Sequence, residues 1–281
     1  MISIIILSYN TKNLLKECLN SIYKYFPTFT FEIIVVDNAS TDGSYEMLKK
    51  DFKDIKLIKS EINLGFAKGI NLGCRNAKGE YFLFLNSDIT IYNSLSLEII
   101  KFMQKNEYVS IAGGQLLDGN GNPQRSYGKF YTLPVVFKML IHGDKGEIST
   151  KNSIIKKVDW VSGGFMAVKR EVFLKLKGFD ENFFMYMEDV ELCYRASIAG
   201  FDTYFFPESK LTHLNQGSSN RTFAIKYIYK GLLYFYKKHK SIAEYFVLKI
   251  LLWSKALSLI FIGTLTHNVY LKKTYSEAIR I

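Results

Sequence analysis

Apolar and polar positions alternate in blocks along roughly the first 92 residues, with short β-branched runs separated by polar or amphipathic stretches. The runs that we predict to be strands are Ile4–Ser8, Glu32–Val36, Ile55–Lys59 and Tyr81–Leu85. Between the first two runs, apolar residues recur at helical spacing, at Leu14, Leu15, Cys18, Leu19 and Ile22. This order is typical of βαβ units, so the pattern predicts a doubly wound α/β fold around a mostly parallel sheet.

The section from about residue 93 to 215 is less regular. Its glycine-rich sequences favour turns, at Gly113-Gly114, Asp118-Gly119-Asn120-Gly121 and Gly163-Gly164. We expect loops and short strands here, including a strand over Thr203–Phe206 followed by a polar loop that contains His213. The stretch Gly128–Val158 has no clear period, which predicts an excursion of the chain over a cleft.

From Arg221 onward the pattern is helical. The first predicted helix is amphipathic, with Ile225, Ile228, Leu232 and Phe235 on one face and Lys226, Lys230 and Lys237 on the other. Phe246–Thr266 is nearly long enough to span a bilayer, but Lys249 and Lys255 would each cost roughly 2.5 to 3.5 kcal/mol near its centre. We therefore expect a helix in the membrane interface with Trp253 at headgroup level; the alternative is a hairpin packed on the rest of the protein.

Charge adds a constraint on partners. The net charge is +11, and residues 222–281 alone carry ten Lys or Arg against two Glu, a net charge of +8. Such an excess attracts nucleic acid, anionic lipid or diphosphate groups, and composition does not choose among them. Three cysteines, Cys18, Cys74 and Cys193, lack the spacing of a zinc site or disulfide framework, so we expect a reducing, cytosolic compartment. The apolar N-terminus is interpreted as a buried strand and not as a signal peptide.

Polar residues follow two predicted strands where ligands bind in open α/β sheets. Asp37 comes directly after Glu32–Val36, and the stretch Asn38–Ser44 offers short side chains and amides for a base and a ribose; the alternative is an ordinary capped turn. Asn86-Ser87-Asp88 follows Tyr81–Leu85, and its carboxylate is our first choice as ligand of a hard divalent cation, although a simple turn has the same composition.

Three further segments are candidates for chemistry. Asn63–Gly73 places glycines and amides before an expected helix, where backbone N–H groups can approach phosphate; a turn and a packing contact would explain them equally. Glu188 and Asp189 lie at an expected helix start, where capping also favours acids. His213 is one of four histidines, and a lone histidine is commonly structural.

Taken in order, five motifs resemble family 2 glycosyltransferases of the GT-A fold, in particular their rhamnosyltransferase-like subgroup. The motifs are Ser8-Tyr9-Asn10, Val36–Gly43, Asn63–Phe66, Asn86-Ser87-Asp88 and Glu188-Asp189. The resemblance covers about residues 1–219. It implies a nucleotide-sugar-binding half at 1–95, an acceptor and catalytic half at 96–219, and a C-terminal helical extension at 220–281.

Carried over by position, the resemblance implies a site for each reactant. Asp189 is the general base, with Glu188 beside it. Asp88 binds Mg²⁺ or Mn²⁺, and His213 assists the metal or the leaving diphosphate. Asp37 contacts the nucleotide base within a donor site that also contains Ser8, Asn10, Asn38, Ser40, Asn63, Gly65, Asn71 and Ser87. Asn86 stands where many relatives carry Asp, which leaves any preference between the two metals open.

The implied reaction is inverting transfer of a sugar from a nucleotide diphosphate donor to a hydroxyl of a saccharide or lipid-linked saccharide, in surface polysaccharide synthesis. dTDP-rhamnose is the first expectation for the donor. With the basic helices, this predicts a peripheral protein on the anionic, cytoplasmic face of the cell membrane. We expect no nucleic-acid partner, because the positive charge lies on the C-terminal helices and leaves the acidic strand ends unexplained.

Two alternatives belong to other classes. A sugar nucleotidyltransferase would need a Gly- and Arg-rich phosphate loop after the first strand, where this chain has Ser8–Lys12. A catalytically inactive sugar-nucleotide-binding partner protein is the other, and the presence of Asp37, Asp88 and Asp189 argues against it.

Overall fold

The computed structural model describes residues 1–26, 30–93, 97–142, 154–214 and 220–281. They form two compact units. The described residues of the first unit fall within 1–129, 154–184 and 188–214, and those of the second within 130–142, 185–187 and 220–281. We describe each unit by itself.

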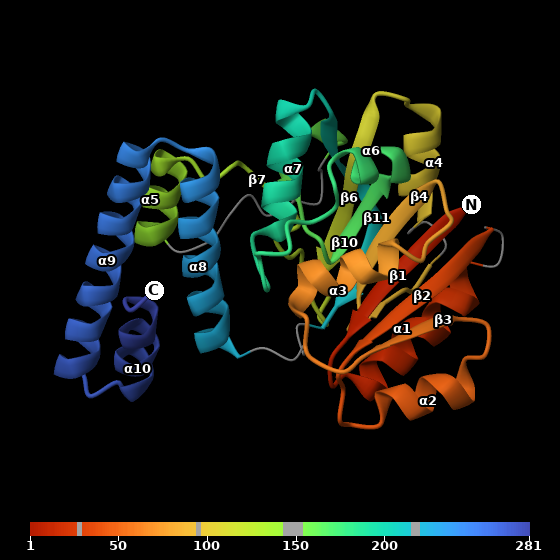
Figure 1. Cartoon of the computed structure of the whole chain (residues 1–281), viewed down its shortest axis with the longest axis horizontal. Coiled ribbons are helices and arrows are strands. Elements are labelled where there is room, and N and C mark those ends of the chain that lie inside the picture. The colour runs from red at the N-terminus through yellow and green to blue at the C-terminus, as the bar shows by residue number, and fades with distance from the viewer. Residues whose placement is uncertain (27–29, 94–96, 143–153, 215–219) are drawn as a thin grey trace. The chain divides into compact units, whose positions relative to one another are not determined.

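Over the described residues, the first unit is built on a nine-stranded sheet, whose main order is β3-β2-β1-β4-β10-β6-β11-β5 (Figure 1). The first four strands are parallel: β1 (Ile2–Ser8), β2 (Phe31–Asn38), β3 (Lys56–Ser60) and β4 (Tyr81–Asn86). All four predicted strands are confirmed to within a few residues. β2 runs further than predicted, so Asp37 is the second-last residue of the strand and does not follow it.

The other half of the sheet mixes strand directions. β10 (Phe165–Lys169) runs antiparallel between β4 and β6 (Val109–Leu117), and β6 is parallel to β11 (Asp202–His213). Two short strands, β5 (Ile89–Thr90) and β8 (Lys156–Lys157), run antiparallel to β11. A separate pair consists of β7 (Tyr127–Gly128) and β9 (Trp160–Val161). Because β10 and the short strands are the reversed members, the sheet is mostly parallel, as predicted.

Two predictions for this half are wrong. Gly113-Gly114 is not a turn but lies inside β6. A Cβ at Gly113 would lie 2.4 Å from the Val161 Cβ, and one at Gly114 would lie 2.0 Å from a ring carbon of Phe165, so close packing requires both glycines. His213 is not in a loop, because β11 continues past an irregularity after Phe206 and ends at this histidine.

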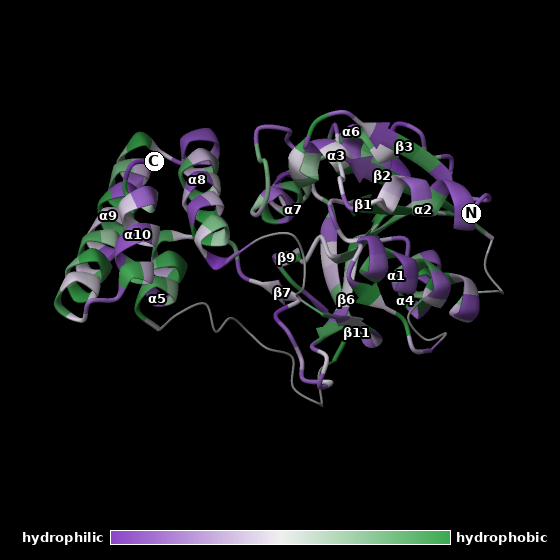
Figure 2. Cartoon of the chain, turned by 90° about the horizontal axis from the view of Figure 1, so that it is seen from below, coloured by the Kyte–Doolittle hydropathy of each residue, from purple (hydrophilic) through white to green (hydrophobic). Residues whose placement is uncertain are grey.

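Helices cover both faces of the sheet (Figures 1 and 2). On one face lie α1 (Lys12–Tyr25), α2 (Ser44–Asp51) and α4 (Glu98–Lys105), which share a core cluster with the sheet. On the other lie α3 (Gly65–Cys74) and α6 (Arg170–Lys175), and α7 (Glu188–Ile198) contacts β9 and β11. The predicted crossover helix is confirmed as α1, whose apolar positions Leu15, Cys18, Leu19 and Ile22 are buried.

The second unit is helical. It contains α5 (Leu133–His142), α8 (Arg221–His239), α9 (Ile242–Leu265) and α10 (Val269–Ala278), and its long helix α9 contacts the other three. The helix predicted after Arg221 is confirmed as α8, in which Leu232 and Phe235 of the predicted apolar face are buried and Ile225 and Ile228 are half-buried. The segment Gly128–Val158, in which the sequence shows no clear period, includes α5; residues 143–153 of it lie outside the described residues. The predicted division at 95/96 and 219/220 stays a prediction.

One helix among the described residues, Ile242–Leu265, is long and apolar enough by length and composition to cross a membrane. Only 22% of its most apolar 18-residue window is buried, unlike a core helix of a soluble protein. Length and composition do not distinguish a spanning helix from one that lies on a surface.

Candidate active site

The loops after β1 and β2 are joined by hydrogen bonds. Asn10 and Ala39 both have left-handed backbone, with φ of 54° and 67°. The Asn10 N–H donates to the Ser40 hydroxyl (3.0 Å), and the Asn10 side-chain oxygen accepts from the Thr41 N–H (2.8 Å). These contacts fix the backbone on both sides of the strand ends, so Asn10 and Ser40 brace this edge of the sheet.

Asp37 is fully buried beside this pair of loops. Its Oδ2 accepts a long hydrogen bond from the Ser40 N–H (3.4 Å), and its Oδ1 has no partner among the described residues. Burial raises the pKa of the Asp37 carboxyl, against the effect of Ser40. A buried carboxylate oxygen without a donor is unfavourable, so the site lacks one N–H or O–H that a ligand can supply.

The start of α3 is held close to β2 by side-chain amides. Asn38 donates to the Asn63 side-chain oxygen (2.9 Å) and accepts from the Leu64 N–H (2.8 Å), while Asn63 also accepts from the Gly65 N–H (2.9 Å). Gly65 has φ of 75°, and a Cβ there would lie 2.2 Å from the Phe184 carbonyl oxygen. The conformation and the close approach both require glycine at this turn.

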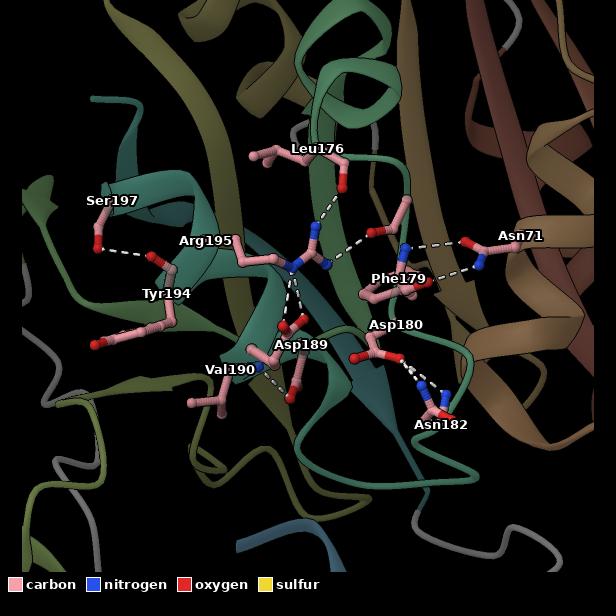
Figure 3. Close-up of polar contacts among 12 residues, drawn as sticks. Asn71, Leu176, Phe179, Asp180, Asn182, Asp189, Val190, Tyr194, Arg195 and Ser197 are labelled. Atoms are coloured by element: carbon pink, nitrogen blue, oxygen red, sulfur yellow. Dashed lines mark hydrogen bonds and ion pairs between the residues drawn. The ribbon is translucent and has the colours of Figure 1, made fainter. Parts of the chain in front are cut away.

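Asn71 and Arg195 hold the loop after α6 from two sides (Figure 3). The Asn71 amide accepts from the Phe179 N–H (3.0 Å) and donates to the Phe179 carbonyl (2.8 Å). Arg195 of α7, paired with the buried Glu191, donates to the Leu176 carbonyl and to the Gly178 carbonyl (2.7 Å). The loop thereby connects the helix α3 with α7, and the Asn71 amide is used in this connection.

A buried chain of hydroxyl groups joins the ends of β1 and β4. The Ser8 and Thr11 hydroxyls lie 3.0 Å apart, and Thr11 donates to the Ser87 hydroxyl (2.9 Å). This chain brings Ser8 and Ser87 together, as predicted residues of one site would be. The sequence does not single out Thr11, because nothing in its context distinguishes it from an ordinary residue before a helix.

Asp88 and His213 face each other at the ends of β4 and β11. The Asp88 Oδ1 lies 3.2 Å from the His213 Nε2, and the Asn86 amide nitrogen lies 3.1 Å from the same Nε2. On the other side of the ring, Nδ1 lies 2.9 Å from the Gln124 Oε1, whose amide also donates to the His213 carbonyl (2.8 Å). An amide oxygen only accepts, so Nδ1 carries a proton; when that is the ring's one proton, Nε2 presents a lone pair, toward which the Asn86 side-chain amide donates.

A lone pair and a carboxylate oxygen at this distance repel each other unless a proton or a cation lies between them. The side chains of His213 and Asp88 are 14% and 5% exposed, so little water is available to separate them. Within the described residues, no group of three or more His, Cys, Asp or Glu is placed to hold a metal. A cation at this pair would therefore need further oxygen ligands from a substrate, as Mg²⁺ sites commonly do.

Asp189 lies at the start of α7 and is half-buried. Its two oxygens accept from the backbone N–H groups of Gly163 (3.0 Å) and Val190 (2.8 Å). Burial raises the pKa of the Asp189 carboxyl, and these hydrogen bonds and the Arg125 guanidinium oppose that rise. Arg125, which stacks on Trp160 at 4.8 Å, is a third residue that sequence reasoning missed, with Thr11 and Gln124.

Glu188 is buried, and its Oε2 has no hydrogen-bond partner in the part of the chain that the structure describes. Burial first, and then the negative charge of Asp189, raise the pKa of the Glu188 carboxyl well above its ordinary range. Of the two acids, Glu188 is the one whose neutral form burial favours more, whereas the two backbone N–H groups that donate to Asp189 favour its charged form.

The turn Gly163-Gly164 connects Asp189 with the pair formed by Asp88 and His213. The Gly163 N–H donates to the Asp189 carboxylate (3.0 Å), and the Gly164 carbonyl accepts from the Asn86 N–H (3.3 Å). The side-chain amide of the same Asn86 lies beside His213. The turn therefore lies between Asp189 and the pair formed by His213 and Asp88.

The same turn leaves little room for side chains. A Cβ at Gly164 would lie 2.9 Å from the Asn86 amide nitrogen, and one at Gly163 would lie 3.3 Å from the Phe66 ring at the start of α3. Three segments from distant parts of the sequence, the end of β4 and the starts of α3 and α7, therefore converge on one turn.

The chain is similar to known proteins. The family model described as Glycosyl transferase family 2 matches residues 3–177. The chain is 28% identical over 249 residues to rhamnosyltransferase WbbL of Escherichia coli, covering 80% of this chain and 88% of that protein. It is 24% identical over 212 residues to N-acetylglucosaminyl-diphospho-decaprenol L-rhamnosyltransferase of Mycobacterium tuberculosis, covering 67% of this chain and 68% of that protein.

A similar solved structure is the mannosyltransferase PcManGT of Pyrobaculum calidifontis in complex with GDP-Man and Mn²⁺. Its TM-score is 0.59 at 17% identity, over 98% of this chain and 78% of the other. At this identity the likeness shows the fold alone, and the fold is GT-A, as predicted.

Proposed function

Since this chain belongs to glycosyl transferase family 2 and is a glycosyltransferase, we propose that it is an inverting, metal-dependent enzyme that moves a sugar from a nucleotide diphosphate donor to an acceptor hydroxyl. The observation that carries the proposal is the pair formed by Asp88 and His213, 3.2 Å apart, beside a turn that also binds Asp189. The family match argues against the sugar nucleotidyltransferase alternative.

The residues of the pair fit a divalent cation. The Nε2 lone pair of His213 and the Asp88 oxygen approach the same point, and Asp88 and His213 are the residues that would hold Mg²⁺ or Mn²⁺. Such a cation, when bound, neutralises negative charge on a departing diphosphate. An acidic residue at position 86 could only accept hydrogen bonds when ionised. Asn86 instead places a hydrogen-bond donor, its amide nitrogen, beside His213.

For the donor, we propose that the Asp37 Oδ1 accepts a hydrogen bond from an N–H of the nucleotide base, because this buried oxygen otherwise lacks a donor among the described residues. Thymine carries such an imide N–H. With the similarity to a rhamnosyltransferase over 80% of the chain, this supports dTDP-rhamnose as the first donor to test. Ser8, Asn10, Asn38, Ser40, Asn63, Gly65, Asn71 and Ser87 would line or brace this donor site.

For the chemical step, Asp189 takes the proton from the acceptor hydroxyl as that oxygen attacks the anomeric carbon. Burial raises the pKa of Asp189, which makes its carboxylate a stronger base than an exposed aspartate. The Gly163 N–H fixes one carboxylate oxygen. Burial raises the pKa of the Glu188 carboxyl, which disfavours a second negative charge that would repel the diphosphate.

We propose a saccharide or lipid-linked saccharide of surface polysaccharide synthesis as the acceptor. The name of the mycobacterial relative specifies a polyprenyl diphosphate acceptor for that protein, which supports the same class here. A lipid-linked acceptor lies in a membrane, so the proposal includes a peripheral location at the inner, cytoplasmic face of the cell membrane. The basic C-terminal helices would favour an anionic surface.

The test measures nucleoside diphosphate released from dTDP-rhamnose, UDP-glucose and GDP-mannose, each with Mg²⁺ or Mn²⁺ and with a saccharide acceptor. We expect turnover with one donor, lost on addition of EDTA and restored by the metal. Asp88→Asn and Asp189→Asn should each reduce kcat by at least about 100-fold. Full turnover in EDTA would contradict the proposed dependence on a metal. Full turnover in Asp189→Asn would contradict the role of Asp189 as general base.

A further inference from the structure

The two long faces of α9 differ in what covers them. One face is buried within the helical unit by Leu248, Leu252, Ala256 and Gly263. The opposite face carries large apolar side chains that are 43% to 71% exposed, at Ile242, Phe246, Ile250, Trp253, Leu257 and Phe261. We call these six residues the outer stripe. Their spacing of three or four residues places them on one side of the helix, and α9 is coloured mostly apolar in Figure 2.

The buried face makes a spanning orientation unfavourable. A Cβ at Gly263 would lie 2.9 Å from the Lys272 backbone nitrogen, so α10 packs directly on the α9 backbone. The Thr222 and Thr274 hydroxyls, 2.8 Å apart, join α8 to α10. A membrane-spanning α9 would have to leave these helices, whereas a helix lying in the interface keeps its inner face on them and exposes the outer stripe.

Positive charge accompanies the stripe. The Lys249 Nζ lies 4.9 Å above the ring of Trp253, which belongs to the stripe. Residues 222–281, which include all of α9 and α10, have a net charge of +8. Two copies of this chain joined through their stripes would bring like charges together, which disfavours association. An anionic lipid surface instead complements the lysines and receives the apolar side chains.

We propose that the outer stripe of α9 lies in the plane of an anionic lipid monolayer, with Trp253 near the headgroups. The inference rests on the peripheral membrane location proposed above and extends it. It assigns the lipid contact to one face of α9 and excludes α9 as a transmembrane anchor. Its occupant is the lipid surface itself. A second copy of the chain is an outcome of the test.

The experiment uses the full chain and vesicles of phosphatidylcholine with about 30% phosphatidylglycerol. Binding is measured by co-sedimentation, and Trp253 emission is followed in the Trp160→Phe background, which leaves one tryptophan. We expect a blue shift on binding and stronger quenching by bromines near the headgroups than by bromines near the chain ends. Ile250→Asn with Leu257→Asn should weaken binding at least about tenfold, since two exposed apolar side chains are lost.

The control is Leu174→Asn with Ile198→Asn, which removes two side chains that are 52% and 68% exposed in the α/β unit. It should bind vesicles like the unchanged protein. Circular dichroism checks that both pairs of variants fold. Equal binding by both pairs would overturn the proposal, and so would equal quenching at all depths, which indicates a spanning helix.

Two further measurements separate the remaining outcomes. A dimer in sedimentation velocity without lipid, converted to a monomer by the α9 pair, together with absence of vesicle binding, would assign the stripe to a second copy and overturn the proposal. Nucleoside diphosphate release with a soluble saccharide acceptor should persist in the α9 pair. If vesicle binding fails while this release persists, the membrane inference fails and the proposed transfer reaction stands.

Discussion

Replacing Gln124 by alanine should weaken metal binding without touching a proposed ligand. The Gln124 amide oxygen lies 2.9 Å from the His213 Nδ1 and fixes the ring with its Nε2 lone pair toward Asp88. Its amide nitrogen also donates to the His213 carbonyl (2.8 Å). In Gln124→Ala both contacts are lost, so the ring can rotate or carry its proton on Nε2, and that tautomer cannot bind a cation through Nε2.

The magnitude follows from two losses. Partners that orient a metal-binding histidine typically contribute about 10- to 100-fold in metal affinity, or roughly 1.4 to 2.8 kcal/mol. The two hydrogen bonds themselves contribute about 0.5 to 1.5 kcal/mol each to folding. The unfolding free energy should therefore fall by about 1 to 3 kcal/mol, while the fold persists.

The assay is a titration of Mn²⁺ into the protein with a saturating nucleoside diphosphate, in which free Mn²⁺ is followed by electron paramagnetic resonance. The dissociation constant should rise about 10- to 100-fold in Gln124→Ala. The control is Gln104→Ala, since Gln104 is exposed on α4. A dissociation constant within about twofold of the unchanged protein, at a metal site that Asp88→Asn abolishes, would refute the role of His213 as an oriented ligand.

Three further predictions concern the same site. Gly65→Ala should lower the unfolding free energy by roughly 1 to 3 kcal/mol in a urea titration and raise the donor KM, because it places a methyl group against the Phe184 carbonyl at φ of 75°. Its control Gly121→Ala, at φ of 81° with nothing near its Cβ among the described residues, should lose only about 1 kcal/mol. Asp37→Asn should weaken donor binding. It should also stabilise the fold at pH values above the ordinary pKa of aspartate. The pKa of Asp37 is higher in the folded than in the unfolded state, so the unfolding free energy of the unchanged protein decreases as pH rises between these two pKa values. For Asp189, whose pKa burial raises, the acid limb of the kcat/KM profile should lie above the ordinary aspartate range; a limb at the ordinary value would contradict the proposed base.

The sequence predicts well what depends on local periodicity and on strand direction. The apolar runs predict β1, β2 and β4, and parallel strands bring their carboxyl ends to one edge, so Asp37, Ser87 and Asp88 could be expected there. The acids at 188 and 189 begin α7 as expected. These inferences need only neighbours in sequence and the rule that ligands bind beyond the carboxyl ends of such strands.

Residues whose roles depend on distant partners could not be predicted. Gln124 meets His213, 89 positions away, because the turn at Asp118–Asn122 folds the chain back beside β6. Glycine is a strong turn signal in a sequence. At position 113, however, glycine is required because Val161 approaches the strand too closely for a side chain.

The turn Gly163-Gly164 explains why motifs so far apart in sequence can serve one reaction. It precedes the antiparallel strand β10, which inserts between β4 and β6 and so begins at the edge where the parallel strands end. Because the strand is reversed, the turn before it reaches that edge, and the backbone N–H of Gly163 binds the Asp189 carboxylate there. The reversed strand thus places a hydrogen-bond donor for the proposed base within the same few residues that contact Asn86, next to the Asp88 and His213 pair.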